Sequence, residues 1–192
     1  MALLPVESTV AAGYGIHWGA ILVTNTDQYQ AMVHSMTNAG FDGQCSEFLY
    51  LDNTEQNQGD GFTGLNRLAN SARGRFVLFC HQDVLAIDGP GRLRDVIGEV
   101  SQKDPNWAVL GNAGVRDGER FLFLNERGTV FAGKSRVAAE PVDALDEDFI
   151  LMRQDARIGF SSDLEGFHLY GADLCTQAKV RGLSAYAVDF RL

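Results

Sequence analysis

Three short apolar segments, each followed by a helical pattern, constrain the fold of this chain more than any other feature. The segments span Ala20–Thr24, Glu47–Asp52 and Arg75–Cys80. Apolar runs of roughly four to eight residues are typical of strands buried on both faces of a parallel sheet. Helical patterns follow at residues 27–40, 61–72 and 93–100, the first with Asp27 as its expected cap. The alternation predicts an α/β domain with a Rossmann-like, mostly parallel central sheet flanked by helices.

The second half of the chain is less regular. Residues 107–111 predict a fourth strand, and glycines and polar residues in 112–135 indicate hairpins or loops. A strand near residues 149–152, a helix over about 170–181 and a last strand at 185–188 complete the pattern. With 192 residues and no repeat or linker, the chain is expected to form one domain over 16–192 after a lead-in at 1–15.

Charge and composition limit the partners and the compartment. The 25 acidic and 16 basic residues give a net charge of -9, which disfavours nucleic acid as a partner. No apolar run approaches the roughly 18 residues that a transmembrane segment needs. The three cysteines (Cys45, Cys80 and Cys175) are far apart, and the chain has no N-x-[ST] sequon. We therefore predict a cytoplasmic protein without a disulfide framework or a thiolate zinc site.

A glycine-rich segment matches the dinucleotide-binding pattern G-x-G-x-x-G at Gly59, Gly61 and Gly64. In that motif the first glycine follows its strand directly, so that the pyrophosphate meets the helix N-terminus. Here residues 53–58 lie between the expected strand end and the first glycine. The spacing favours a glycine-rich loop with another role over an NAD(P) site.

The segment His81-Gln82-Asp83 follows the most apolar of the expected strands. Ligands of open α/β sheets bind at the carboxyl ends of the strands. Alternate strand residues share a face, so His81 and Asp83 are placed to reach one divalent cation. The alternative is that Asp83 only caps a turn.

An acidic side chain, Asp173, lies in the first turn of the last expected helix. A carboxylate near a helix N-terminus stays ionised, which suits a helix-stabilising role or a general base. His168, close by, is either a ligand or a packed or surface residue. The acidic run from Asp143 to Asp148 is typical of a solvated face, with function expected for at most one or two members.

Taken in order, these segments resemble the family 2 glycosyltransferases of the GT-A fold over about residues 16–190. The resemblance rests on four segments, at 64–79, 81–84, 142–153 and 160–174. His81-Gln82-Asp83 stands where the family has its D-x-D metal motif, in a form similar to that of a recognisable subgroup.

The resemblance implies an inverting, metal-dependent transfer of a sugar from a nucleotide-sugar donor to a hydroxyl of a glycan or lipid-linked acceptor, as in polysaccharide biosynthesis. It implies that Asp173 is the general base. It implies that Asp83, with His81 as a second ligand, binds Mn²⁺ or Mg²⁺. The residues implied to border the donor are Thr24, Asn25, Asp52, Asn66 and Gln82.

Three departures from the family pattern leave alternatives open. His81 replaces the first aspartate of D-x-D, and Ala172 replaces the glutamate before the base. The chain stops at Leu192, where relatives continue, so a C-terminal extension is expected to be lacking. The alternatives are a noncatalytic nucleotide-sugar-binding or assembly module on the same fold and, less favoured, a Rossmann NAD(P)-binding protein.

Overall fold

The structure is a computed structural model that describes residues 16–42, 46–126, 129–132 and 139–192, with only the backbone described for 16–20, 123–126 and 129–132. The predicted lead-in at 1–15, Cys45 and parts of the predicted hairpin region lie outside the described residues.

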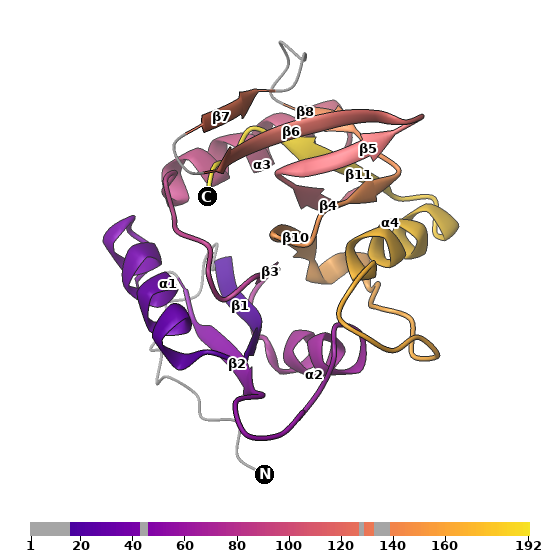
Figure 1. Ribbon diagram of the computed structural model, residues 1–192. Coiled ribbons are helices and arrows are strands. Elements are labelled where there is room, and N and C mark those ends of the chain that lie inside the picture. The colour runs from indigo at the N-terminus through magenta and orange to yellow at the C-terminus, as the bar shows by residue number, and fades with distance from the viewer. Residues whose placement is uncertain (1–15, 43–45, 127–128, 133–138) are drawn as a thin grey trace.

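A seven-stranded sheet forms the centre of the molecule, in the order β2-β1-β3-β10-β4-β11-β8 (Figure 1). Five strands run in one direction, and β10 and β8 run against them. The strands are β1 (Ile16–Val23), β2 (Phe48–Asp52), β3 (Phe76–Cys80), β4 (Trp107–Gly111), β8 (Ala139–Pro141), β10 (Phe149–Arg153) and β11 (Ser184–Val188). The predicted mostly parallel sheet is thus confirmed, with one antiparallel strand in its middle.

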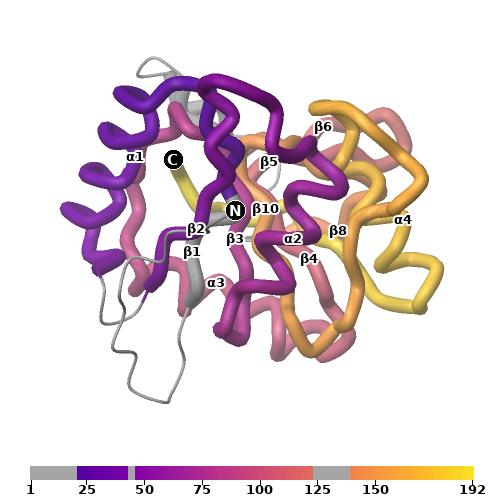
Figure 2. The backbone as a smooth tube through the Cα atoms, turned by 90° about the horizontal axis from the view of Figure 1, so that it is seen from below, coloured from indigo at the N-terminus to yellow at the C-terminus, as the bar shows by residue number. Residues whose placement is uncertain are grey.

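Helices cover both faces of this sheet. They are α1 (Thr26–Asn38), α2 (Thr63–Ser71), α3 (Pro90–Lys103) and α4 (Tyr170–Val180), with a short 3-10 helix η1 at Gln154–Ala156. α1 and α3 contribute their buried side chains to one apolar cluster, and α2 and α4 contribute theirs to the other. Figure 2 shows α1 and α4 on opposite sides of the sheet. Because both faces are covered, β3 and β4 are buried along their whole length, which explains their uninterrupted apolar sequence.

A smaller antiparallel sheet lies above β4 and β11 in Figure 1, in the order β7-β6-β5-β9. Its strands are β5 (Ala113–Arg116), β6 (Glu119–Glu126), β7 (Thr129–Ala132) and β9 (Ala144–Leu145). Asp117 and Gly118 join β5 to β6 with positive φ angles of 52° and 78°, as a tight hairpin turn requires. The predicted hairpins are confirmed within the described residues.

One local expectation needs correction, and one strand runs in a direction that the sequence left open. α1 is capped by Asn25, whose Oδ1 accepts a hydrogen bond from the Gln28 amide at 3.1 Å, and Asp27 lies inside the first turn. The N-cap precedes the first helical residue, and the helix begins at Thr26. β10 runs antiparallel because the chain enters it from β9, which pairs with β5 at the edge where β4 ends.

Candidate functional site

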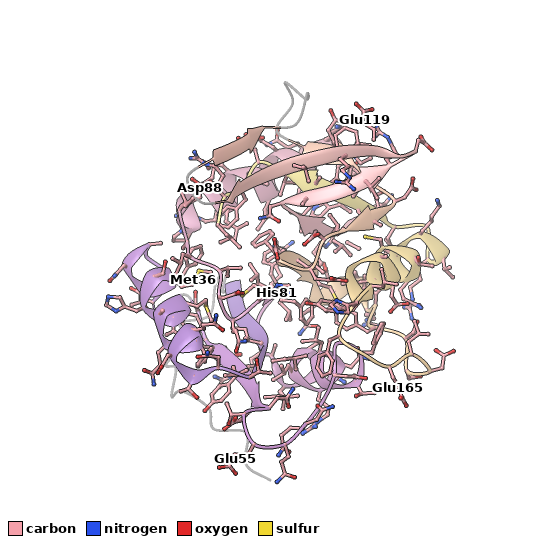
Figure 3. The ribbon with its side chains drawn as sticks, viewed as in Figure 1. Met36, Glu55, His81, Asp88, Glu119 and Glu165 are labelled. Carbon is pink, nitrogen blue, oxygen red and sulfur yellow. The ribbon has the colours of Figure 1, made fainter. Side chains whose placement is uncertain are left out.

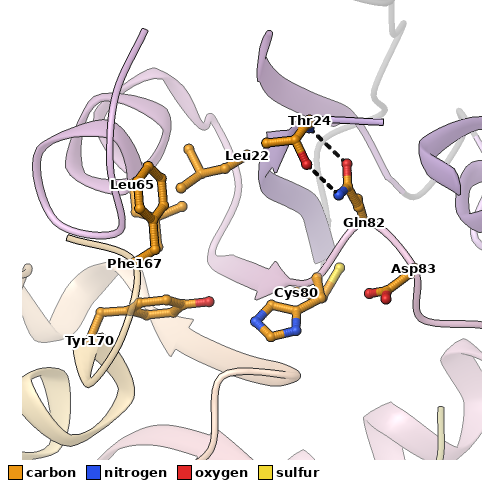
Figure 4. A pocket seen from close by; sticks show the side chains of 9 residues that line it. Leu22, Thr24, Leu65, Cys80, Gln82, Asp83, Phe167 and Tyr170 are labelled. Atoms are coloured by element: carbon orange, nitrogen blue, oxygen red, sulfur yellow. Dashed lines mark hydrogen bonds between the residues drawn. The ribbon is translucent and has the colours of Figure 1, made fainter. Parts of the chain in front are cut away.

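A cavity of about 350 Å³ opens at the carboxyl ends of β1 and β3 (Figure 4). This edge is the place where an open α/β sheet binds its ligands, because the loops that follow parallel strands converge there. The start of α4 and the loop before it close the other side. The lining residues are Leu22, Thr24, Leu65, Cys80, His81, Gln82, Asp83, Phe167 and Tyr170.

Gln82 ties the end of β1 to the end of β3. Its Oε1 accepts hydrogen bonds from the backbone amides of Thr24 and Asn25, both at 2.8 Å. Its Nε2 donates to the Thr24 hydroxyl at 2.8 Å, as the dashed lines of Figure 4 indicate. The structure therefore brings the predicted residues Thr24 and Gln82 together, with the Gln82 amide engaged in holding the two strand ends.

His81 contacts Asp148, a member of the acidic run that the sequence predicts to be a solvated face. Its Nδ1 lies 3.2 Å from Oδ1 of Asp148, the residue just before β10. The hydrogen bond to Asp148 is the main cause that raises the pKa of His81; burial opposes it, and the charges of Asp148, Asp83 and Asp146 add to it. His81 lies near the centre of Figure 3. With Nδ1 engaged, Nε2 is the ring nitrogen left for a ligand.

The side chains at this edge supply some, but not all, of the ligands that a divalent cation needs. Among the described residues, no three His, Cys, Asp or Glu side chains are grouped as metal ligands. Asp83 is exposed and lines the cavity beside His81. Mg²⁺ in nucleotide sites is held by one or two carboxylates together with substrate phosphates. The residues present fit such a shared site, in which a diphosphate completes the ligands.

Asp173 lies in the first turn of α4, as predicted, but outside the cavity lining. Its Oδ2 accepts a hydrogen bond from the Ser161 amide at 2.8 Å, and its Oδ1 accepts one from the Ser161 hydroxyl at 2.6 Å. Gln177 donates to the same hydroxyl at 2.8 Å. The carboxylate thus anchors the loop that precedes α4.

The other residues predicted to border the donor also bind the chain itself. The Asn66 amide donates to the Phe160 carbonyl at 2.8 Å and accepts from the Phe160 amide at 3.0 Å. Asp52 accepts hydrogen bonds from the Thr54 hydroxyl and amide, which lower its pKa. Neither Asn66 nor Asp52 lines the cavity, and Asn25 caps α1. Of the predicted site, the structure gathers Thr24, His81, Gln82 and Asp83.

The glycine-rich segment is a packing loop. A Cβ on Gly59 would lie 2.7 Å from Cα of Gly64, and one on Gly61 would lie 2.6 Å from the Tyr170 ring. The Gly61 amide donates to the Gly166 carbonyl at 2.8 Å. The glycines therefore allow β2, α2 and the loop before α4 to approach closely, which supports a glycine-rich loop with a packing role rather than an NAD(P) site.

The two cysteines that the structure describes are not available as nucleophiles. Cys80 and Cys175 are free and buried, and burial raises the pKa of each thiol to about 12. Cys80 lines the cavity, but a thiol this hard to ionise is a poor nucleophile.

In the part of the chain that the structure describes, no helix has the length and apolar character needed to cross a membrane.

Comparison with solved structures identifies the architecture. S. aureus TarS 1–349 in complex with UDP-GlcNAc is 14% identical, with a TM-score of 0.55 over 92% of this chain and 56% of that one. The mannosyltransferase PcManGT from Pyrobaculum calidifontis, in complex with GDP-Man and Mn²⁺, is 11% identical, with a TM-score of 0.56 over 93% of this chain and 57% of that one. The chain thus spans somewhat more than half of these structures, and its fold is the GT-A fold of glycosyltransferases.

Comparison of sequences identifies a relative. No family model matches the chain. A protein of Fuscovulum blasticum named "ATP synthase subunits region ORF 6" is 38% identical over 182 residues, which cover 89% of this chain and 72% of the relative. At this identity and coverage, the chain belongs to the same family as the ORF 6 protein of the Fuscovulum blasticum ATP synthase subunits region.

Proposed function

We propose that this protein is a glycosyltransferase that moves a sugar from a nucleotide-sugar donor to a hydroxyl of a glycan or lipid-linked acceptor. The observation that carries the proposal is the cavity at the carboxyl ends of β1 and β3, within the GT-A fold. Two structures of that fold are named as complexes with UDP-GlcNAc and with GDP-Man and Mn²⁺.

The charges around the cavity support a divalent cation as part of the donor site. None of the nine described lining residues is a lysine or an arginine, so a diphosphate finds no fixed side-chain cation of this kind there. We assign Asp83 as the carboxylate ligand, with His81 Nε2 as the second donor. When bound, Mn²⁺ or Mg²⁺ supplies positive charge that stabilises the departing nucleoside diphosphate.

We assign Asp173 as the general base of an inverting displacement. The acceptor hydroxyl attacks the anomeric carbon, the nucleoside diphosphate leaves, and Asp173 accepts the hydroxyl proton. The Ser161 hydroxyl, 2.6 Å from Asp173 Oδ1, shows that this carboxylate accepts a hydrogen bond from an alcohol. An acceptor hydroxyl that takes the place of Ser161 receives the same interaction.

The base assignment is tested by Asp173→Asn, which keeps the shape of the side chain and removes its basicity. We expect sugar transfer from UDP-GlcNAc or GDP-mannose with Mn²⁺ to fall by about 10²–10⁴-fold, because general bases contribute that much. Donor affinity should be unchanged. Asp163→Asn, an exposed position in the same loop, is the matched control. Wild-type turnover by Asp173→Asn would contradict the assignment.

A second candidate function is a noncatalytic nucleotide-sugar-binding module on the same fold. The observation that favours it is that both Asp173 oxygens are engaged by Ser161, while Ala172 supplies no further carboxylate beside it. This candidate predicts that the protein binds a nucleotide-sugar but releases no nucleoside diphosphate with any member of a broad acceptor panel. Turnover with any acceptor rules it out.

A further inference from the structure

A second cavity, of about 340 Å³, lies at the opposite edge of the central sheet. Phe76 and Trp107, the first residues of β3 and β4, line it, and so does Arg153, the last residue of β10. Because β10 runs against its neighbours, all three residues lie at the amino-terminal edge of the parallel strands. α3 forms the outer wall. The cavity is therefore separate from the candidate donor site.

Three arginines line this cavity, although the chain carries a net charge of -9. Arg153 is occupied: its Nη1 donates to the carbonyls of Pro105 and Trp107, both at 2.9 Å, and its Nε and Nη2 donate to Asp155 at 2.8 and 3.0 Å. Arg75 and Arg94 form no ion pair with another described residue, and no carboxylate is among the described lining residues. Both guanidinium groups are thus free of direct ion pairs with described residues, although the charge of Arg75 helps to lower the pKa of Asp155.

Aromatic rings provide an apolar wall beside these charges. The rings of Phe76 and Trp107 stack at a centroid distance of 6.0 Å with an interplanar angle of 8°. The Arg75 guanidinium lies 5.4 Å from the centre of the Phe76 ring, and that of Arg153 lies 5.2 Å from the Trp107 ring. The indole N–H of Trp107 is satisfied by the Ser101 hydroxyl at 2.8 Å. The wall is therefore preorganised.

Gly98 keeps the helix side of the cavity open. It lies in the interior of α3, where glycine is the least favourable residue after proline. A Cβ at this position would meet no atom within 4 Å, so packing does not require a glycine there. The missing side chain leaves room between α3 and the aromatic wall.

We propose that this cavity binds a small organic anion, a phosphate or carboxylate carried on an aromatic group. Arg75 and Arg94 bind the anionic end, because guanidinium groups match the paired oxygens of both groups. The aromatic end lies over Gly98, against Ile97 and the small exposed part of the Phe76 ring. The proposal does not depend on the glycosyltransferase assignment, because it uses the opposite edge of the sheet.

The test uses isothermal titration calorimetry of the full chain with phenyl phosphate, benzoate, inorganic phosphate and phenol. We expect phenyl phosphate or benzoate to bind at least about tenfold more tightly than inorganic phosphate or phenol, because only the joined molecule uses both parts of the cavity. Arg75→Gln and Arg94→Gln should each weaken binding by about tenfold. Gly98→Leu should abolish it by filling the cavity.

The matched control is Gly91→Leu, since Gly91 is on the same helix, its Cβ also meets nothing within 4 Å, and it does not line the cavity. Gly91→Leu should bind as the wild type does. Thermal unfolding of each variant verifies that it folds, and Arg94→Gln changes an exposed side chain if Gly98→Leu does not fold. Absence of binding by both aromatic anions, or binding that survives Arg94→Gln and is lost in Asp83→Asn, overturns the proposal.

Discussion

At the scale of single residues, polar side chains around the candidate site mainly hold the backbone in place. Gln82 binds the backbone amides at the end of β1, and Asn66 binds both backbone groups of Phe160. Asp173 binds the backbone amide and the side-chain hydroxyl of Ser161. Of these residues, Gln82 alone lines the described cavity, and its bonds preorganise the wall at the strand ends, which reduces the conformational cost of binding a ligand.

Gly61→Ala tests this fixed arrangement directly. The new methyl group would lie 2.6 Å from the Tyr170 ring and 3.0 Å from the Gly166 carbonyl oxygen, so the loop before α4 has to move. We expect a loss of about 1–3 kcal/mol in the free energy of unfolding, measured by urea denaturation. Gly98→Ala, where a Cβ meets nothing, should instead be neutral or stabilising by up to about 1 kcal/mol. Equal stability of the two variants would contradict the packing.

At the scale of elements, one carboxylate connects the start of α2 to the loop before α4. Asp60 Oδ1 accepts hydrogen bonds from the amides of Phe62 and Thr63, and its Oδ2 accepts one from the Gly166 amide at 3.0 Å. Phe167, which follows directly, lines the candidate donor cavity. The position of that wall therefore depends on an interaction made by Asp60, just before α2 begins.

The pKa of Asp60 predicts how acid weakens this connection. Burial raises the pKa, but the hydrogen bonds from Gly166, Thr63 and Phe62 together outweigh burial, so the pKa is lowered in the folded protein. The stabilisation is therefore complete above the unfolded pKa of about 3.9 and is lost as the pH falls through the lower folded value. Unfolding free energies measured between about pH 7 and pH 2.5 should show a smaller acid-induced loss in Asp60→Asn than in the wild type.

Asp163→Asn is the control for the loss of one acidic side chain, because Asp163 is an exposed acidic residue of the loop before α4. An identical acid-induced loss in Asp60→Asn and the wild type would mean that Asp60 does not contribute.

At the scale of the whole molecule, the two cavities differ in charge. The candidate donor cavity has Asp83 and His81 but no lysine or arginine among its described lining residues, while three arginines line the cavity at the opposite edge. The described lining of the donor cavity therefore offers a diphosphate no lysine or arginine to neutralise its charge. The proposed donor site thus predicts that a diphosphate binds there together with a cation from solution.

This distribution predicts that nucleotide and metal bind together. UDP or GDP alone should not raise the melting temperature, and neither should Mn²⁺ alone, because the residues that the structure describes offer too few ligands without the phosphates. The two together should stabilise the fold by about 2.7 kcal/mol when the ligand is at 100 times its dissociation constant. A thermal-shift assay measures this. Asp83→Asn should lose the effect, and Asp163→Asn should keep it; an equal rise with EDTA present would contradict a metal-dependent site.

The sequence by itself determined the four described helices, the described strands of the central sheet other than β8, the mostly parallel sheet and the edge that holds the candidate site. Burial on both sheet faces produces continuous apolar runs, and the polar residues after them mark the strand ends, so both signals are local. The tertiary structure alone decided that β10 enters the sheet antiparallel and that Asp148 pairs with His81. It also decided that Asn66 and Asp173 bind the loop before α4. These partners are distant in sequence, and the path of the chain, which no local pattern records, brings them together.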